Sequence, residues 1–319
     1  MAEALAASAA RLDPRKFRDP LFTASGERRA QVALKSLDTL WFNTGTLCNL
    51  TCRHCYIESS PRNDRLVYLS AAEIAEYLDE IEHLNLGTRL IGFTGGEPFM
   101  NPALPAMLET ALARGFRTLV LTNAMKPMGK MKPALLALRR RHGERLQIRV
   151  SLDHYGRGVH EAERGRRSWQ PTLDGLQWLA ANGFAPTVAS RRLSGESEAE
   201  IRRGFAGLFF ELGLAIDAAD PLALTVFPEM DPAADVPEIT EACWGLLGKS
   251  PADVMCAGSR MVVRFKEAAR PSVIACTLLP YDPRFDLGPT LEGALGQVAL
   301  NHPHCAKFCV LGGGACSRG

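Results

Sequence analysis

Three cysteines, Cys48, Cys52 and Cys55, lie within eight positions in the stretch CNLTCRHCY. A tetrahedral zinc site takes four ligands, usually in two separated pairs, and no second pair lies near this one in the sequence. A cluster of four irons also takes four ligands, so three thiolates leave one iron open to a ligand that is not protein. The residues alone leave a cluster and a zinc site as alternatives, and the cluster needs no further protein ligand.

The elements that must position these thiols follow from hydrophobic periodicity. Six apolar stretches predict strands at residues 39–45, 89–95, 117–123, 146–153, 184–190 and 222–227. Helical periods lie between them, near 70–87, 103–115, 132–142, 172–182 and 197–212. The first begins with a capping box, Ser70 with Glu73. This alternation predicts parallel βαβ units in an open sheet or a barrel, with the cysteine loop directly after the first strand, where such folds gather their chemistry.

The composition predicts a globular protein of the cytoplasm. The chain of 319 residues is 46% hydrophobic and 23% charged, with a formal charge of +2, so no global field favours nucleic acid. The run RRR at 139–141 closes a predicted helix and is expected to face water. No apolar run is long enough for a membrane span, and the start of the chain does not resemble a secretory signal. In the cytoplasm, nine cysteines indicate metal binding rather than disulfides.

The pattern divides the chain into three segments. Residues 1–36 form an N-terminal extension that either wraps the core or stays loose. Residues 37–230 form the α/β core. In residues 231–319 the alternation of strands and helices fades, and five of the nine cysteines fall there. We therefore expect a domain boundary near residue 230.

The loop CxxxCxxC followed by the aromatic Tyr56 resembles the cluster loop of the radical S-adenosylmethionine (SAM) superfamily. The resemblance covers roughly residues 37–228 and implies a partial (βα)6 barrel of the TIM type. It also implies that SAM chelates the open iron of a 4Fe-4S cluster and is cleaved on reduction to a 5′-deoxyadenosyl radical. The cofactor carries this chemistry, and the protein orients it.

Further motifs follow in the family's order. GFTGGEP, with Gly95, Gly96 and Glu97, resembles the segment that meets the SAM amino group. Ser151 and Asp153 end the fourth strand on one face, where they could bond ribose hydroxyls.

HEAERG resembles an HDxxRG segment of peptide-modifying members, so Arg164 is either a partner of the SAM carboxylate or part of a structural ion pair. Ser190 and Arg191 are weaker candidates of the same kind.

The remaining cysteines form a second group near the end of the chain, except for Cys243, which is expected to be a packed thiol. The group comprises Cys256, Cys276, Cys305, Cys309 and Cys316. This region resembles a shortened SPASM or twitch extension and implies one auxiliary 4Fe-4S cluster on four of the five thiols, with Cys316 the first to be left out. The alternative is a structural zinc on Cys305 and Cys309 with Cys316, His302 or His304.

These patterns predict a radical SAM enzyme with oxidoreductase-like chemistry that modifies a peptide or protein side chain. One alternative is an enzyme of the same superfamily acting on a small metabolite or cofactor precursor, and another is a non-catalytic protein stapled by zinc. The partners would be the peptide or small-molecule substrate and a reductant such as a flavodoxin or ferredoxin. No residue is identified as the substrate acid or base: His154, Tyr155 and Asp282 are expected to be structural or solvated.

Overall fold

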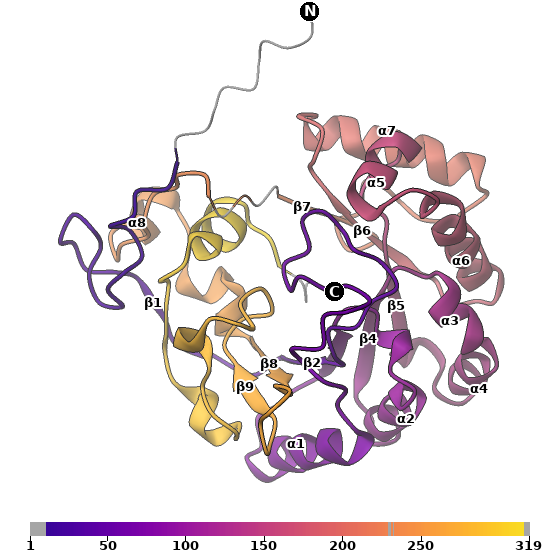
Figure 1. Ribbon diagram of the computed structural model, residues 1–319, viewed down its shortest axis with the longest axis horizontal. Coiled ribbons are helices and arrows are strands. Elements are labelled where there is room, and N and C mark those ends of the chain that lie inside the picture. Colours follow the sequence, from indigo (N-terminus) through magenta and orange to yellow (C-terminus); the bar gives the residue numbers. More distant parts are fainter. Residues whose placement is uncertain (1–10, 229–230, 232, 316–319) are drawn as a thin grey trace, which may run out of the picture.

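The computed structural model describes residues 11–228, 231 and 233–315, and its centre is one curved sheet of eight strands (Figure 1). The strand order is β7-β6-β5-β4-β3-β2-β8-β9. Neighbouring strands from β7 to β8 are parallel, and β9 runs antiparallel to β8. The bounds are β2 Thr39–Asn43, β3 Leu90–Thr94, β4 Arg117–Thr122, β5 Leu146–Ser151, β6 Thr187–Arg191, β7 Leu224–Phe227, β8 Ser259–Val263 and β9 Ser272–Ile274. The predicted partial barrel is confirmed.

Helices cover the outer face of this sheet (Figure 1). They are α1 Ala71–His83, α2 Leu104–Ala113, α3 Lys126–Lys130, α4 Lys132–His142, α5 Arg157–Arg164, α6 Trp169–Ala181 and α7 Glu198–Glu211, with α8 Cys243–Leu247 in the C-terminal segment. Single-turn helices lie at Pro98–Met100, Gly143–Arg145, Pro251–Asp253, Met255–Ala257, Pro283–Phe285 and Glu292–Leu295, and a π-helix at Cys305–Leu311. The Ser70 capping box of α1 is present, but α3 and α5 were missed because both are short.

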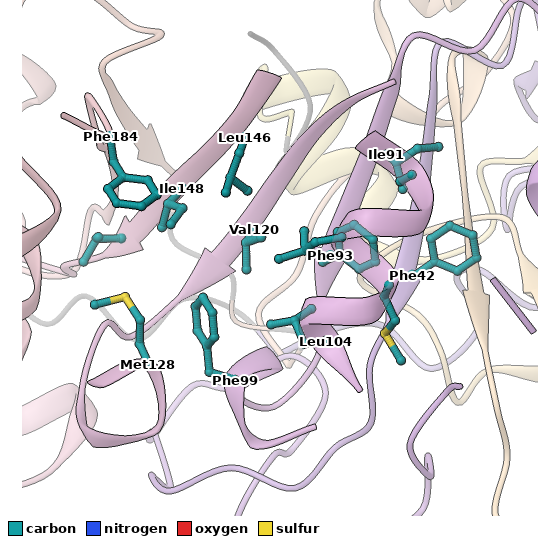
Figure 2. Packing of buried hydrophobic residues seen from close by; sticks show 14 of the residues in the cluster. Phe42, Ile91, Phe93, Phe99, Leu104, Val120, Met128, Leu146, Ile148 and Phe184 are labelled. Atoms are coloured by element: carbon teal, nitrogen blue, oxygen red, sulfur yellow. The ribbon is translucent and has the colours of Figure 1, made fainter. Parts of the chain in front are cut away.

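The main core lies between the sheet and these helices. Phe42 of β2 and Phe93 of β3 stack with ring centroids 5.9 Å apart, and Val120 of β4 and Ile148 of β5 continue the same layer (Figure 2). Leu104 of α2 lies close to this layer, again fully buried (Figure 2). Burial of these side chains on one face fixes the register of β2, β3, β4 and β5, because a slip by one residue would turn them to the other face.

The alternate residues of the same strands face the inside of the barrel. Trp41 of β2 and Leu119 of β4 belong to a second apolar cluster, which the C-terminal segment completes. Gly92 makes room for the indole, because a Cβ atom there would lie 2.2 Å from Cε3 of Trp41. The inner face of the sheet is therefore filled by residues from both halves of the chain.

The sheet continues across residue 230, near which we expected a domain boundary. β8 and β9 extend it beyond β2, and neither was predicted because both follow a long irregular stretch and β9 is short. The N-terminal segment packs on the same side: β1 (Gln31–Val32) pairs with β10 (Val298–Ala299), and the buried Arg29 guanidinium forms an ion pair with Glu238 at 2.5 Å. Among the described helices, none has the length and apolar character needed to cross a membrane.

Candidate functional site

The three-cysteine loop leaves the carboxyl end of β2 and lies against the loop that follows β3. The Gly96 N–H donates to the Gly45 carbonyl at 2.8 Å, and the Glu97 N–H donates to the Leu47 carbonyl at 3.1 Å. A Cβ atom on Gly96 would lie 2.2 Å from that Leu47 oxygen, and Gly95 has φ +146°, so both positions require glycine. The Gly-Gly-Glu segment is thus a backbone strap that holds the start of the cysteine loop.

A cavity of about 180 Å³ opens beside this strap. Nine of the residues predicted to hold a cluster or SAM line it, and they come from four separate parts of the core. These are Cys48, Cys52, Cys55, Tyr56, Gly95, Gly96, Ser151, Asp153 and Arg164. The lining also has an apolar part, which includes Trp41, Leu121, Ala189, Phe227 and Leu278. The tertiary structure therefore gathers nine predicted site residues around one space.

The Glu97 side chain of the strap is not part of the cavity lining. Its carboxylate accepts from the Asn123 N–H at 2.8 Å, from the Thr122 hydroxyl at 2.7 Å and from the Phe99 N–H at 3.2 Å. Burial raises the pKa of Glu97 to about 7 in spite of these donors. The residue ties the strap to Thr122 and Asn123 at the end of β4, within the strand predicted at 117–123.

Asp153 faces two arginines. Its carboxylate lies 2.8 Å from Nε of Arg164 and 3.0 Å from Nη2 of Arg191. Burial acts to raise the pKa of Asp153, but the two guanidinium groups outweigh it and hold the pKa well below its usual value. Of the two alternatives for Arg164, the structural ion pair is therefore present. The Ser190 hydroxyl, a weaker candidate for contacting SAM, donates instead to the Asp153 carbonyl at 2.8 Å.

The loop thiols lie in surroundings that disfavour a bare thiolate. Burial raises the pKa of Cys48 to about 12 and also raises that of Cys52. Thiols with such pKa values are protonated at pH 7, and a metal releases those protons when it binds. The donor set, three sulfurs with a glycine strap beside them, is chemically suited to an iron–sulfur cluster and an additional small ligand.

A second, smaller cavity gathers the C-terminal cysteines. Four of the five predicted thiols line it, namely Cys256, Cys276, Cys305 and Cys309. His304 also lines this cavity, and Cys316 lies outside the described residues. Burial raises the pKa of Cys256 to about 11 and that of Cys305 well above its ordinary value.

Cys243 is not part of the lining. It accepts from the Thr240 N–H at 3.3 Å and packs against the second apolar cluster.

Arg260 of β8 is a fully buried cation beside this second cavity. It donates to the carbonyls of Cys256 at 2.6 Å, Ala294 at 2.9 Å and Gly296 at 3.0 Å. Burial lowers the pKa of Arg260, and the thiols of Cys256 and Cys276 act to raise it. A guanidinium in this place favours an anionic occupant of the cysteine cavity.

Neither thiol group is arranged around a single ion. Among the described residues, no three His, Cys, Asp or Glu side chains converge closely enough to hold one metal ion. Thiolates on a four-iron cluster each bind a different iron and need not converge on one point. Leu278 lines both cavities, so one short segment after Cys276 separates them.

The parallel sheet and the cysteine-lined cavity at the carboxyl ends of its strands define a partial α/β barrel that carries its site where such barrels gather their chemistry. The sequence profile of the Radical SAM superfamily matches residues 42–201, half of the chain, and the protein belongs to this superfamily.

Two curated relatives align with part of the chain. AlbA of Bacillus subtilis (strain 168), described as an antilisterial bacteriocin subtilosin biosynthesis protein, is 30% identical over 143 residues, which make up 44% of this chain and 30% of AlbA. GTP 3′,8-cyclase 1 of Mycobacterium tuberculosis (strain ATCC 25618 / H37Rv) is 32% identical over 149 residues, 44% of this chain and 39% of the cyclase. The alignments thus span about a third of each relative.

The fold is similar to crystal structures of SuiB from Streptococcus suis. The SuiB structure bound to S-adenosylmethionine superposes with a TM-score of 0.57 at 12% identity, over 80% of this chain and 63% of SuiB. The structure bound to the precursor peptide SuiA gives a TM-score of 0.56 at 13% identity, over 77% and 61%. At this identity the likeness describes the fold.

Proposed function

We propose that the protein is a radical SAM enzyme that modifies a side chain of a peptide or protein. Cys48, Cys52 and Cys55 would hold a 4Fe-4S cluster with one open iron. When bound there, the cluster and SAM supply a 5′-deoxyadenosyl radical that abstracts hydrogen from the substrate. The observation that carries the proposal is that the three thiols, the glycine strap and Ser151 line one cavity.

We assign different roles in SAM binding to the residues that line the cavity. The backbone at Gly95 and Gly96 would receive the amino group of SAM, because only glycine allows so close an approach there. Ser151 would bond the ribose. Both oxygens of Asp153 are engaged by arginines, so we assign to Asp153 the placing of Arg164 and Arg191 at the cavity wall. Arg164 would then offer its charge to the SAM carboxylate.

A peptide is favoured over a nucleotide by the apolar part of the cavity wall. Leu121, Phe227 and Leu278 give that wall an apolar surface, which suits an uncharged side chain and excludes water from a radical. The named product of AlbA is a bacteriocin, and SuiB binds a precursor peptide. Because GTP 3′,8-cyclase 1 is also a relative, a small-molecule substrate is the second candidate. A reductant such as a flavodoxin or ferredoxin would supply the electron.

We further propose one auxiliary 4Fe-4S cluster on Cys256, Cys276, Cys305 and Cys309. Their shared cavity and the buried Arg260 beside it support an anionic group with four protein ligands. The alternative is a structural zinc on Cys305 and Cys309 with Cys316, His302 or His304.

The deciding experiment compares the wild-type protein with Cys52→Ala after anaerobic reconstitution. The wild type should bind about eight irons with matching sulfide and cleave SAM under reduction, as two four-iron clusters require. Cys52→Ala should retain about four irons in the tail and lose SAM cleavage. Cleavage at the wild-type rate by this variant would contradict the assignment.

Metal analysis separates the remaining alternatives. About four irons with one zinc would keep the enzyme and make the tail a zinc site. Zinc without iron or sulfide would support the alternative of a non-catalytic protein whose cysteines bind structural zinc.

A further inference from the structure

Arg53 and His54, which lie between the second and third loop cysteines, are both bonded by Glu163, 109 positions after His54. The Arg53 N–H donates to the Glu163 carbonyl at 2.8 Å, and the His54 N–H donates to the Glu163 carboxylate at 2.9 Å. The His54 ring nitrogen Nδ1 lies 2.7 Å from the second oxygen of the same carboxylate. Glu163, near the end of α5, thus holds both residues that separate Cys52 from Cys55.

Arg191, the last residue of β6, completes the contact. Its Nη1 donates to the His54 carbonyl at 2.9 Å, and its Nη2 lies 2.6 Å from the Glu163 carboxylate. The same guanidinium bonds Asp153 through Nε and Nη2 at 3.2 and 3.0 Å. The peptide groups on both sides of His54 are therefore bonded by one buried ion pair, which Asp153 anchors to the end of β5.

This pair is charged and removed from water. The side chains of Glu163 and Arg191 are 4% and 10% exposed. Burial acts to raise the pKa of Glu163, but Arg191 and the donors of His54 outweigh it, so the pKa lies below its ordinary value. The loop itself has no regular secondary structure and leaves backbone groups that need partners. Without the pair, its peptide groups would be free to reorient.

We propose that Glu163 and Arg191 are positioning residues that set the direction of the Cys52 and Cys55 thiolates by holding the backbone between them. This inference rests on the proposed cluster at the loop. Neither residue needs to touch the cluster: each acts through the peptide groups on either side of His54. Partners one shell beyond metal ligands orient those ligands, and their loss weakens metal binding by about 10- to 100-fold.

The test uses the full chain, reconstituted with iron and sulfide, carrying Glu163→Gln. Glu161→Gln is the matched control, because Glu161 lies on the same helix and bonds Arg157 and the Arg167 N–H instead. The spectrum of a cluster with an open iron changes when SAM is added, whereas a cluster with four protein ligands does not respond. Electron paramagnetic resonance of the reduced protein therefore follows the loop cluster separately from the tail cluster.

We expect a ferrous chelator to remove the SAM-responsive cluster at least about tenfold faster from Glu163→Gln than from the wild type or Glu161→Gln. The tail signal should decay at one common rate, which also shows that the variant is folded. Arg191→Lys should lose the SAM-responsive cluster at a rate between those of the wild type and Glu163→Gln, because lysine keeps the charge but lacks the planar guanidinium group.

Equal loss rates of the SAM-responsive cluster in Glu163→Gln, Arg191→Lys and the wild type would overturn the positioning role. Faster loss of both clusters in Glu163→Gln, without an effect in Arg191→Lys, would also overturn it, because that result describes general destabilisation. A wild type without any SAM-responsive cluster would instead refute the proposed function.

Discussion

At the scale of single residues, the site depends on buried polar groups whose partners are backbone groups, hydroxyls and charged side chains. Glu97 shows this most clearly, because its carboxylate receives two backbone N–H groups and a hydroxyl yet has a pKa raised by burial to about 7. Its proton is therefore bound more tightly in the folded protein than in the unfolded chain, where the pKa is near 4.5. Such a residue links the stability of the strap to pH.

Glu97→Gln should remove this pH dependence from the cluster-free protein. For a carboxyl group whose pKa is raised by folding, the stabilisation is complete below about pH 4.5 and is lost as the pH rises through about 7. The loss amounts to about 3 kcal/mol. Chemical denaturation between pH 5 and 8 should show the free energy of unfolding of the wild type falling relative to that of the variant. Parallel curves for the two proteins would refute the link.

At the scale of elements, β8 joins the two cysteine sites. It pairs with β2, from which the loop cysteines follow, and it carries Arg260 against the carbonyl of Cys256. A strand that periodicity did not predict therefore places the tail thiols relative to the barrel. The cation at its centre has only carbonyls as hydrogen-bond acceptors among the described residues, so an anionic cluster would complete its surroundings.

Arg260→Met should destabilise the cluster-free protein by about 3 kcal/mol or more, because several buried carbonyls lose their donor. It should also lower tail-cluster iron after reconstitution. Arg264→Met is the control: this arginine, just beyond β8, is partly exposed and pairs with Glu73, so its loss should cost about 1 kcal/mol or less. Urea unfolding and iron analysis measure both effects, and equal losses in the two variants would contradict the role of Arg260.

At the scale of the whole molecule, the C-terminal segment forms part of the barrel site. Thr277 and Leu278 line the cavity of the three-cysteine loop, and the Tyr281 hydroxyl donates to the Ile57 carbonyl at 3.0 Å, just after that loop. The Arg65 guanidinium lies 3.5 Å from the centre of the Tyr281 ring. The core of residues 37–230 thus relies on later residues for a wall of its cavity and for the support of its loop.

A chain ending at residue 230 should accumulate as insoluble protein. Its β2 edge, which pairs with β8 from Thr39 to Phe42, would be exposed together with the inner apolar face. A chain ending at residue 315 should remain soluble and keep about eight irons, because the four gathered tail thiols are retained. The soluble fraction and the iron content of the two shortened chains test this prediction. A soluble, monomeric chain ending at 230 would instead make the core an independent domain.

Much of this arrangement was predictable because it is local. The spacing of Cys48, Cys52 and Cys55, the paired glycines and the capping box of α1 act over a few residues, so neighbouring side chains alone determine them. The alternation of apolar residues likewise determined six parallel strands and the edge at which the site lies.

Only the tertiary structure decided which distant groups meet. Glu163 and Arg191 reach His54 across 109 and 137 positions, and the tail cysteines line one cavity although β8, β9 and β10 lie between them in the chain. Such contacts depend on how helices and strands pack, and no short-range pattern encodes a partner at that distance. The sequence by itself therefore determined the chemistry of the loop, while packing determined what holds that loop in place.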